Sequence, residues 1–163
     1  DKQKSLTDHK IEWHFIGPIQ SNKCKLIAEN FSWVHSVDRI KVANKLNNSL
    51  KEKTSLNVCM QVNISNEDSK SGLKINEIDS LAEHINSLDK LTLRGLMAIP
   101  SNTSNDEILK NEYKQLKVLY ENLKKKYLSV DTLSMGMSND YLLAIENGSN
   151  LVRIGSKIFG KRT

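Results

Sequence analysis

The sequence predicts an α/β protein in which strands and helices alternate around a parallel sheet. Apolar, β-prone runs alternate with amphipathic stretches along the 163 residues, as repeated βα units require. The run 58–64 is almost continuously apolar, which is typical of a strand covered on both faces. Two Gly/Ser turns follow the last two predicted strands, where α/β barrels often hold phosphate. Together these features indicate a (β/α)8 barrel of TIM type.

Six βα units can be placed in order along the chain. We expect strands near residues 13–16, 33–37, 57–64, 91–98, 130–135 and 150–154. We expect helices near residues 20–30, 39–50, 76–88, 107–127 and 138–147, and a short helical turn at 157–159. A closed barrel needs eight units and about 200 residues or more. We therefore expect two further units upstream of Asp1, and we treat residues 1–163 as a single partial domain.

Two of the helices show a clear apolar stripe, with apolar residues three and four positions apart. The stripe of the helix near 76–88 consists of Ile78, Leu81, Ala82, Ile85 and Leu88. The stripe of the helix near 107–127 consists of Leu109, Tyr113, Leu116, Tyr120 and Leu123. Each stripe is expected to pack on the sheet.

The helix near 107–127 also explains a basic run. It begins with a capping-box pattern, Ser-Asn-Asp-Glu at 104–107, and ends with three lysines at 124–126. Acids in the first turn and cations in the last turn both complement the helix dipole. The net charge of +5 leaves a nucleic-acid-binding module as an alternative, but few aromatic residues lie among the basic ones. We expect no specific nucleic-acid partner.

Composition excludes several other classes of protein. The chain is 38% hydrophobic and 26% charged, and no run approaches the roughly 18 apolar residues of a membrane span. Residues 1–12 are polar and contain no apolar signal core. Cys24 and Cys59 lie far apart and outside any zinc-ligand spacing, so we expect reduced thiols and no metal. These features favour a cytoplasmic protein.

Two amides interrupt the apolar strand near 57–64. Gln61 and Asn63 are two positions apart, so they share one face near the end of the strand. Side chains there would line the mouth of a barrel, where such barrels keep their sites. The alternative is a pair of hydrogen-bonded core amides.

The two Gly/Ser turns, at 133–138 and 151–156, each precede a predicted helix. Glycine lets the backbone approach a bulky anion, and a helix N-terminus offers unpaired N–H donors. We expect Ser138 to be the N-cap of the helix near 141–147, while Gly155 and Ser156 open the turn around 157–159. Ordinary strand-to-helix turns are the alternative interpretation of each turn.

Several motifs together resemble a known family. They are Trp-His-Phe-Ile-Gly-Pro-Ile-Gln-Ser-Asn-Lys at 13–23, Val-Asn-Ile-Ser at 62–65 with Ser-Lys-Ser-Gly at 69–72, Arg-Gly-Leu-Met-Ala-Ile-Pro at 94–100, the two turns, and Ile-Phe-Gly at 158–160. In this combination the sequence resembles the pyridoxal phosphate (PLP) homeostasis proteins, single-domain barrels similar to the N-terminal domain of alanine racemase. The resemblance covers essentially the whole chain and implies PLP as the cofactor.

The resemblance assigns the two ends of the cofactor to different residues. Ser138, Gly155 and Ser156 would hold the phosphate, and Arg153 would face the pyridine nitrogen. A guanidinium stays protonated and cannot give the ring a proton, so the cofactor would be a poor electron sink. The implied role is to bind, buffer and deliver PLP to PLP-dependent apoenzymes without catalysis, and we expect a monomer with no catalytic residue.

Four further positions follow from the resemblance. Met97 and Asn63 would lie near the ring, His14 near the barrel mouth, and Lys70 on the side of the phenolic oxygen. Structural alternatives remain for three of them: Met97 as plain core, His14 as a hydrogen-bonded strand histidine, and Lys70 as a solvated loop amine.

The sequence departs from the family at the lysine that binds the cofactor aldehyde. A segment like Ser-Lys-Thr-Lys-Pro is not found here, and none of the 20 lysines lies in an apolar strand. Lys70 is the best substitute amine. A missing upstream segment is the most economical explanation, and a degenerate gene product or a non-covalent binding remnant are the others. A racemase-like PLP enzyme lacking its second domain is the alternative function.

Overall fold

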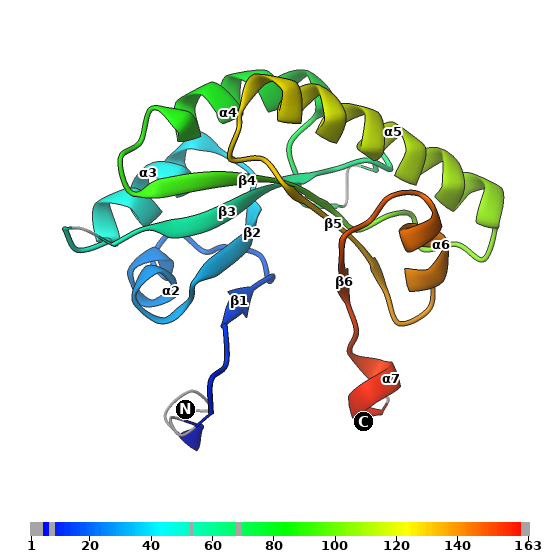
Figure 1. Ribbon diagram of the computed structural model, residues 1–163, viewed down its shortest axis with the longest axis horizontal. Helices are drawn as coiled ribbons and strands as arrows, with labels where there is room; N and C mark the ends of the chain where they lie inside the picture. The colour runs from blue at the N-terminus through cyan, green and yellow to red at the C-terminus, as the bar shows by residue number, and fades with distance from the viewer. Residues whose placement is uncertain (1–4, 7–8, 53, 68–69, 161–163) are drawn as a thin grey trace.

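The computed structural model describes residues 5–6, 9–52, 54–67 and 70–160. Within them, six parallel strands lie side by side in sequence order (Figure 1). These are β1 (His14–Phe15), β2 (Trp33–Val37), β3 (Leu56–Val62), β4 (Leu91–Ala98), β5 (Thr132–Met137) and β6 (Leu151–Arg153). The six predicted strands and the α/β class are confirmed.

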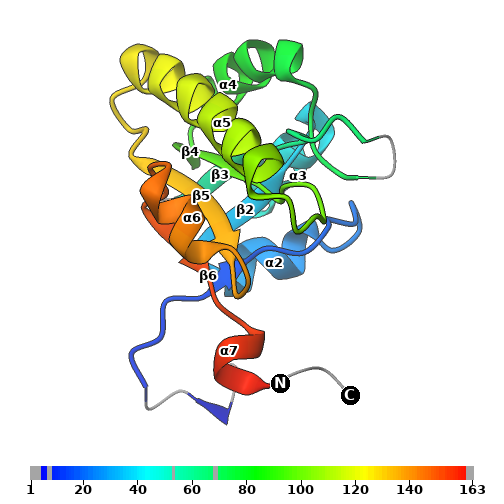
Figure 2. The same cartoon turned by 90° about the vertical axis from the view of Figure 1, so that its right-hand side faces the viewer.

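The sheet is curled into an arch, and β1 and β6 are its two edge strands (Figure 1). Helices α3, α4 and α5 cover the convex side, as the perpendicular view also shows for α4 and α5 (Figure 2). The helices are α2 (Cys24–Asn30), α3 (Ile40–Ser49), α4 (Ile78–Asn86, after the 3₁₀ turn Ile75–Glu77), α5 (Asp106–Lys126), α6 (Tyr141–Glu146) and α7 (Ser156–Phe159). This curvature and alternation are those of a TIM-type barrel wall.

Two helix starts differ from the prediction. Helix α2 begins at Cys24 instead of residue 20, because the Lys23 N–H bonds the Gln20 carbonyl in a turn before the helix. The N-cap of α5 is Asn105, whose side chain accepts from the backbone N–H groups of residues 107 and 108. The three lysines do occupy the last turn of α5, and Lys126 pairs with Asp79 of α4 at 2.8 Å.

The two faces of the sheet differ in chemistry. The convex face and the helices share the main apolar core, which includes both predicted helix stripes except the partly buried Leu88. On the concave face Trp33, Cys59 and Met97 form a smaller buried cluster, against which Ile16 packs. The concave face therefore carries an apolar cluster of its own, separate from the main core.

A bulge in β4 changes which residues face each side. Val58 of β3 pairs with Leu93, but Cys59 pairs with Gly95, so Arg94 is the extra residue. Gly95 has φ +150°, and a Cβ there would lie 1.8 Å from the Thr132 carbonyl oxygen. Only glycine allows β4 and β5 to approach this closely.

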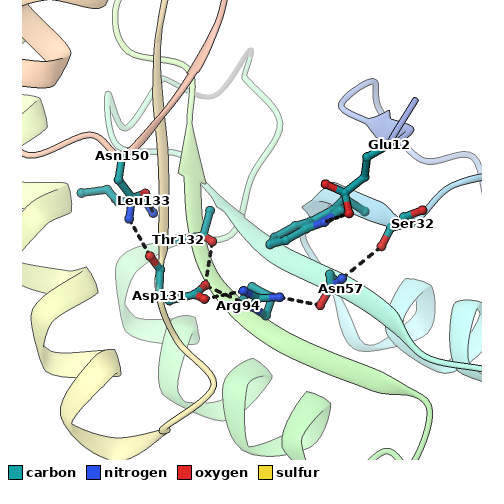
Figure 3. A network of polar contacts seen from close by, with 9 residues as sticks. Glu12, Ser32, Asn57, Arg94, Asp131, Thr132, Leu133 and Asn150 are labelled. Carbon is teal, nitrogen blue, oxygen red and sulfur yellow. Dashed lines mark hydrogen bonds and ion pairs between the residues drawn. The ribbon is translucent and has the colours of Figure 1, made fainter. Parts of the chain in front are cut away.

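A polar network fills the concave face toward the amino ends of the strands (Figure 3). Arg94 pairs with Asp131 through two N–H groups and donates to Asn57 Oδ1 at 2.9 Å. Its guanidinium carbon also lies 4.6 Å from the centre of the Trp33 ring. Hydrogen bonds to Asp131 raise the pKa of Arg94 and lower the pKa of Asp131. This network braces the strands at the end of the barrel opposite the predicted site.

Both cysteines are free and buried. Burial raises the pKa of Cys59 to about 12, so its thiol is held neutral.

Among the helices of the described ranges, none combines the length and apolarity needed to cross a bilayer.

Candidate functional site

Asp140 holds the turn between β5 and α6. Its Oδ1 accepts from the Met137 N–H at 2.6 Å, and its Oδ2 accepts from the Tyr113 hydroxyl at 2.7 Å. Burial and this hydrogen bond raise the pKa of Tyr113. Asp140 is the N-cap residue of α6, so the predicted N-cap role of Ser138 is wrong. The Asp140 N–H bonds the Met137 carbonyl, and this closed turn delays the helix beyond Ser138.

Ser138 instead contacts the start of the last helix. Its Oγ accepts from the N–H groups of Gly155 at 3.2 Å and Lys157 at 3.3 Å. Ser138 is buried, Ser156 is exposed, and a Cβ added to Gly155 would meet no atom within 4 Å. The two predicted phosphate turns therefore meet in space, with two backbone donors converging on an oxygen atom.

Arg153 lies at the carboxyl end of β6 and reaches across the sheet. Its NH1 donates to the carbonyl and the hydroxyl of Ser134, both at 2.9 Å, and its NH2 donates to the Ala98 carbonyl at 2.9 Å. Burial lowers the pKa of Arg153, and the nearby Tyr113 and Asp140 oppose this effect. Within the described residues Arg153 makes no ion pair, and its Nε–H has no hydrogen-bond acceptor. The side chain is thus a half-buried cation with donor capacity left.

Two histidines lie behind Arg153. His14 Nδ1 is 2.9 Å from His35 Nε2, and His35 Nδ1 is 3.1 Å from Ser134 Oγ. The His14 ring stacks on Trp33 with ring centres 5.2 Å apart and an interplanar angle of 5°. His35 is fully buried, and burial, with the charges of His14 and Arg153, lowers its pKa to about 4.

The two predicted amides brace the loop after β3. Gln61 Nε2 donates to the Ser71 carbonyl at 3.0 Å, and Asn63 Nδ2 donates to the carbonyls of Glu67 at 2.8 Å and Lys70 at 3.4 Å. Gln61 is buried, and its amide fits the alternative of a hydrogen-bonded core group. Both amides position the backbone that carries Lys70.

Lys70 and Met97 reach the same region from different sides. Lys70 Nζ donates to the Pro100 carbonyl at 2.9 Å and pairs with Glu67 at 2.8 Å. Met97 is fully buried in the concave cluster, three residues before Pro100 on the same segment. The carboxyl end of β4 therefore lies between Lys70 and Arg153, which bonds the Ala98 carbonyl.

Sequence reasoning missed three residues of this region, His35, Ser134 and Asp140. His35 lies in the fully buried strand β2, and an ionisable residue in such a strand is a signal that sequence reasoning could have used. Asp140 directly precedes the helix expected near 141–147, a position that suits an N-cap. The contact of His35 with Ser134 joins residues 99 positions apart and leaves no local signal.

Residues 5–163 match the family described as alanine racemase, N-terminal domain. The chain belongs to this family. It is 53% identical over 156 residues to the pyridoxal phosphate homeostasis protein of Vibrio alginolyticus, covering 95% of the chain and 67% of that protein. It is 49% identical over 153 residues to the protein of the same name from Escherichia coli K12, covering 93% and 65%. The resemblance to the pyridoxal phosphate homeostasis proteins is confirmed, and the chain spans about two thirds of their length.

Solved structures share the fold of this chain. PipY of Synechococcus elongatus with PLP bound is 30% identical, with a TM-score of 0.88 over 98% of this chain and 76% of that one. Alanine racemase of Corynebacterium glutamicum, at 13% identity, has a TM-score of 0.72 over 99% and 46%. The racemase match shows the barrel fold alone. Among the described residues, no three metal-ligating side chains gather at one point.

Proposed function

We propose that this chain binds PLP at the carboxyl end of the sheet and serves PLP homeostasis without transforming a substrate. The observation that carries the proposal is Arg153, a half-buried guanidinium whose hydrogen bonds go to neutral oxygens only. Burying a cation without an anionic partner is costly. A bound ligand with an acceptor atom would use the remaining donor capacity, and the membership in a PLP-named family supports PLP as that ligand.

We assign the phosphate to the place where the turns that carry Ser138, Gly155 and Ser156 meet. The N–H groups that point at Ser138 Oγ match the backbone donors of a phosphate site, and the hydroxyl of Ser138 can donate to a phosphate oxygen in turn. Open space beside Gly155 leaves room for the group. In this proposal Asp140 acts indirectly, by fixing the turn that carries Ser138.

Arg153 sets the chemical character of the site. PLP supplies an aldehyde and an electron-accepting ring when bound. Arg153 would donate a hydrogen bond to the ring nitrogen and keep its own proton, so the ring would stay neutral and weakly electron-accepting. This favours holding and delivering the cofactor, with PLP-dependent apoenzymes as recipients, over racemisation.

The remaining predicted residues have supporting roles in this proposal. Met97 supplies an apolar floor on the concave face, and His14 lies at its edge strand. Asn63 and Lys70 belong to the segment that follows β3, and Lys70 is assigned to the side of the phenolic oxygen. Lys70 Nζ is engaged as a donor to Pro100 and Glu67, so we expect it to form no covalent adduct.

Equilibrium titration of the purified chain with PLP, followed by absorbance and protein fluorescence, tests the proposal. We expect Arg153→Met and Ser138→Ala each to weaken binding about tenfold, the value of one charged hydrogen bond. Lys110→Met is the matched control, because it removes a partly exposed cation of α5 that, among the described residues, pairs with Glu107 and lies outside the candidate site. Pyridoxal, which lacks the phosphate, should bind weakly to the wild type and equally weakly to Ser138→Ala.

Two results would contradict the proposal. One is equal PLP affinity in Arg153→Met and Lys110→Met. The other concerns covalent attachment: borohydride reduction followed by peptide mass mapping should leave Lys70 unmodified, and a stoichiometric pyridoxyl adduct there would overturn its assigned role.

A further inference from the structure

A continuous line of hydrogen bonds runs from the interior of the site to its edge strand. Arg153 NH1 is 2.9 Å from Ser134 Oγ, Ser134 Oγ is 3.1 Å from His35 Nδ1, and His35 Nε2 is 2.9 Å from His14 Nδ1. His14 Nε2 ends the line at Glu12 Oε2, 3.4 Å away. The line joins a cation that can only donate to a carboxylate that can only accept.

These two ends limit the possible arrangements of protons. His14 Nε2 must donate to Glu12, so a neutral His14 has an unprotonated Nδ1 and accepts from His35. His35 is neutral, because burial in a site with a neighbouring guanidinium lowers its pKa to about 4. With its proton on Nε2, its Nδ1 must accept from the Ser134 hydroxyl. The lone pairs of Ser134 Oγ are then free for Arg153.

One added proton reverses this order. If His14 becomes an imidazolium, its Nδ1 also donates, and His35 must accept at Nε2 and carry its proton on Nδ1. His35 then donates to Ser134, whose Oγ receives two N–H donors and whose own hydrogen turns away from His35. Among the described residues, Glu12 before β1 and His35 on β2 contact His14 directly, Arg94 of β4 lies over the Trp33 ring on which His14 stacks, and Arg153 on β6 reaches the line through Ser134.

Glu12 also holds the outer end of the line in place. Its Oε1 accepts from Trp33 Nε1 at 3.1 Å while its Oε2 faces His14. The same carboxylate therefore binds both members of the stacked His14–Trp33 pair. This fixes the His14 ring with Nδ1 toward His35.

We propose that His35 is a positioning residue that orients Arg153 through Ser134, and that the protonation of His14 sets the direction of this hydrogen-bond line. The inference rests on the proposed PLP site for its effect on binding. The line itself belongs to the protein and can be observed without a ligand.

Long-range ¹H–¹⁵N correlation spectra of histidine rings, recorded on the ligand-free chain across a pH titration, test the line directly. With His14 neutral, we expect both His14 and His35 to carry the proton on Nε2. As His14 titrates, we expect the His35 proton to move to Nδ1 at the same midpoint. A His35 ring that keeps one tautomer throughout, or changes with a different midpoint, would overturn the proposal.

Binding provides the second readout. His35→Leu removes the acceptor for Ser134 and should weaken PLP binding about five- to tenfold. His35→Asn places an amide oxygen near the position of Nδ1 and should recover most of the lost affinity. Equal affinity of the two variants would overturn the positioning role. If the wild type binds no PLP at all, the proposed function fails, whereas the tautomer measurement still decides the hydrogen-bond line.

Discussion

Acidification should destabilise this protein through His35 in particular. The pKa of this buried histidine is lowered from 6.5 to about 4 in the folded chain. Between these values the unfolded chain binds a proton that the folded chain does not, so stability is complete above pH 6.5 and falls as the pH drops toward 4. The full difference of about 2.5 pKa units corresponds to about 3.4 kcal/mol, of which about 2 kcal/mol should be lost by pH 5.

Urea unfolding at pH 7.5 and pH 5.0 measures this loss. The wild type contains other acid-sensitive groups, so the quantity to compare is the change in unfolding free energy between the two pH values. His35→Asn should reduce that change by about 2 kcal/mol. His9→Asn, a substitution of an exposed histidine, should leave the wild-type change intact. If His35→Asn and the wild type lose the same free energy to within about 0.5 kcal/mol, the argument from burial is refuted.

Three further predictions follow from single contacts. Gly95→Ala should cost more than about 3 kcal/mol or prevent folding, because its Cβ would collide with the backbone of β5; a variant with wild-type urea stability would contradict this. Tyr113→Phe should lower the free energy of unfolding in urea by about 1–2 kcal/mol, because Asp140 loses a hydrogen-bond donor in a buried site. An unchanged unfolding midpoint would show that this hydrogen bond does not stabilise the turn. In the native protein a thiol reagent at pH 8 should label neither buried cysteine quickly, since burial raises the pKa of Cys59 to about 12. Unfolded protein should react at both cysteines. Rapid labelling of the native protein would argue against the packing of the concave face.

The sequence predicted the strands best where local pattern decides the structure. The apolar runs at 33–37 and 91–98 became β2 and β4 with the expected bounds, and the stripe of α5 is buried as its spacing required. Helix starts were less predictable. The Gln20 carbonyl and the Asn105 side chain each accept from a backbone N–H group near a helix start, and several neighbouring residues could have taken the same role.

The candidate site was predictable only in part, for a physical reason. Ser138 and Gly155 were expected near one ligand, and they do meet. The partner of Ser138, however, is a backbone N–H 17 residues away, and the partner of His35 is 99 residues away. Such contacts depend on the curvature of the sheet, which hydrophobic periodicity does not encode.

The bulge at Arg94 reverses the alternation of side chains between the two faces of strand β4. Before it, Leu91 and Leu93 face the helices; after it, Leu96 takes that side and Met97 faces the concave cluster. Arg94 and Met97 thus share a face although they are three positions apart, a spacing that would put them on opposite faces of a regular strand. Deleting one residue here would exchange the sides of Leu96 and Met97. A single insertion in the pairing therefore lets one strand supply both the brace at one end of the barrel and an apolar floor at the other.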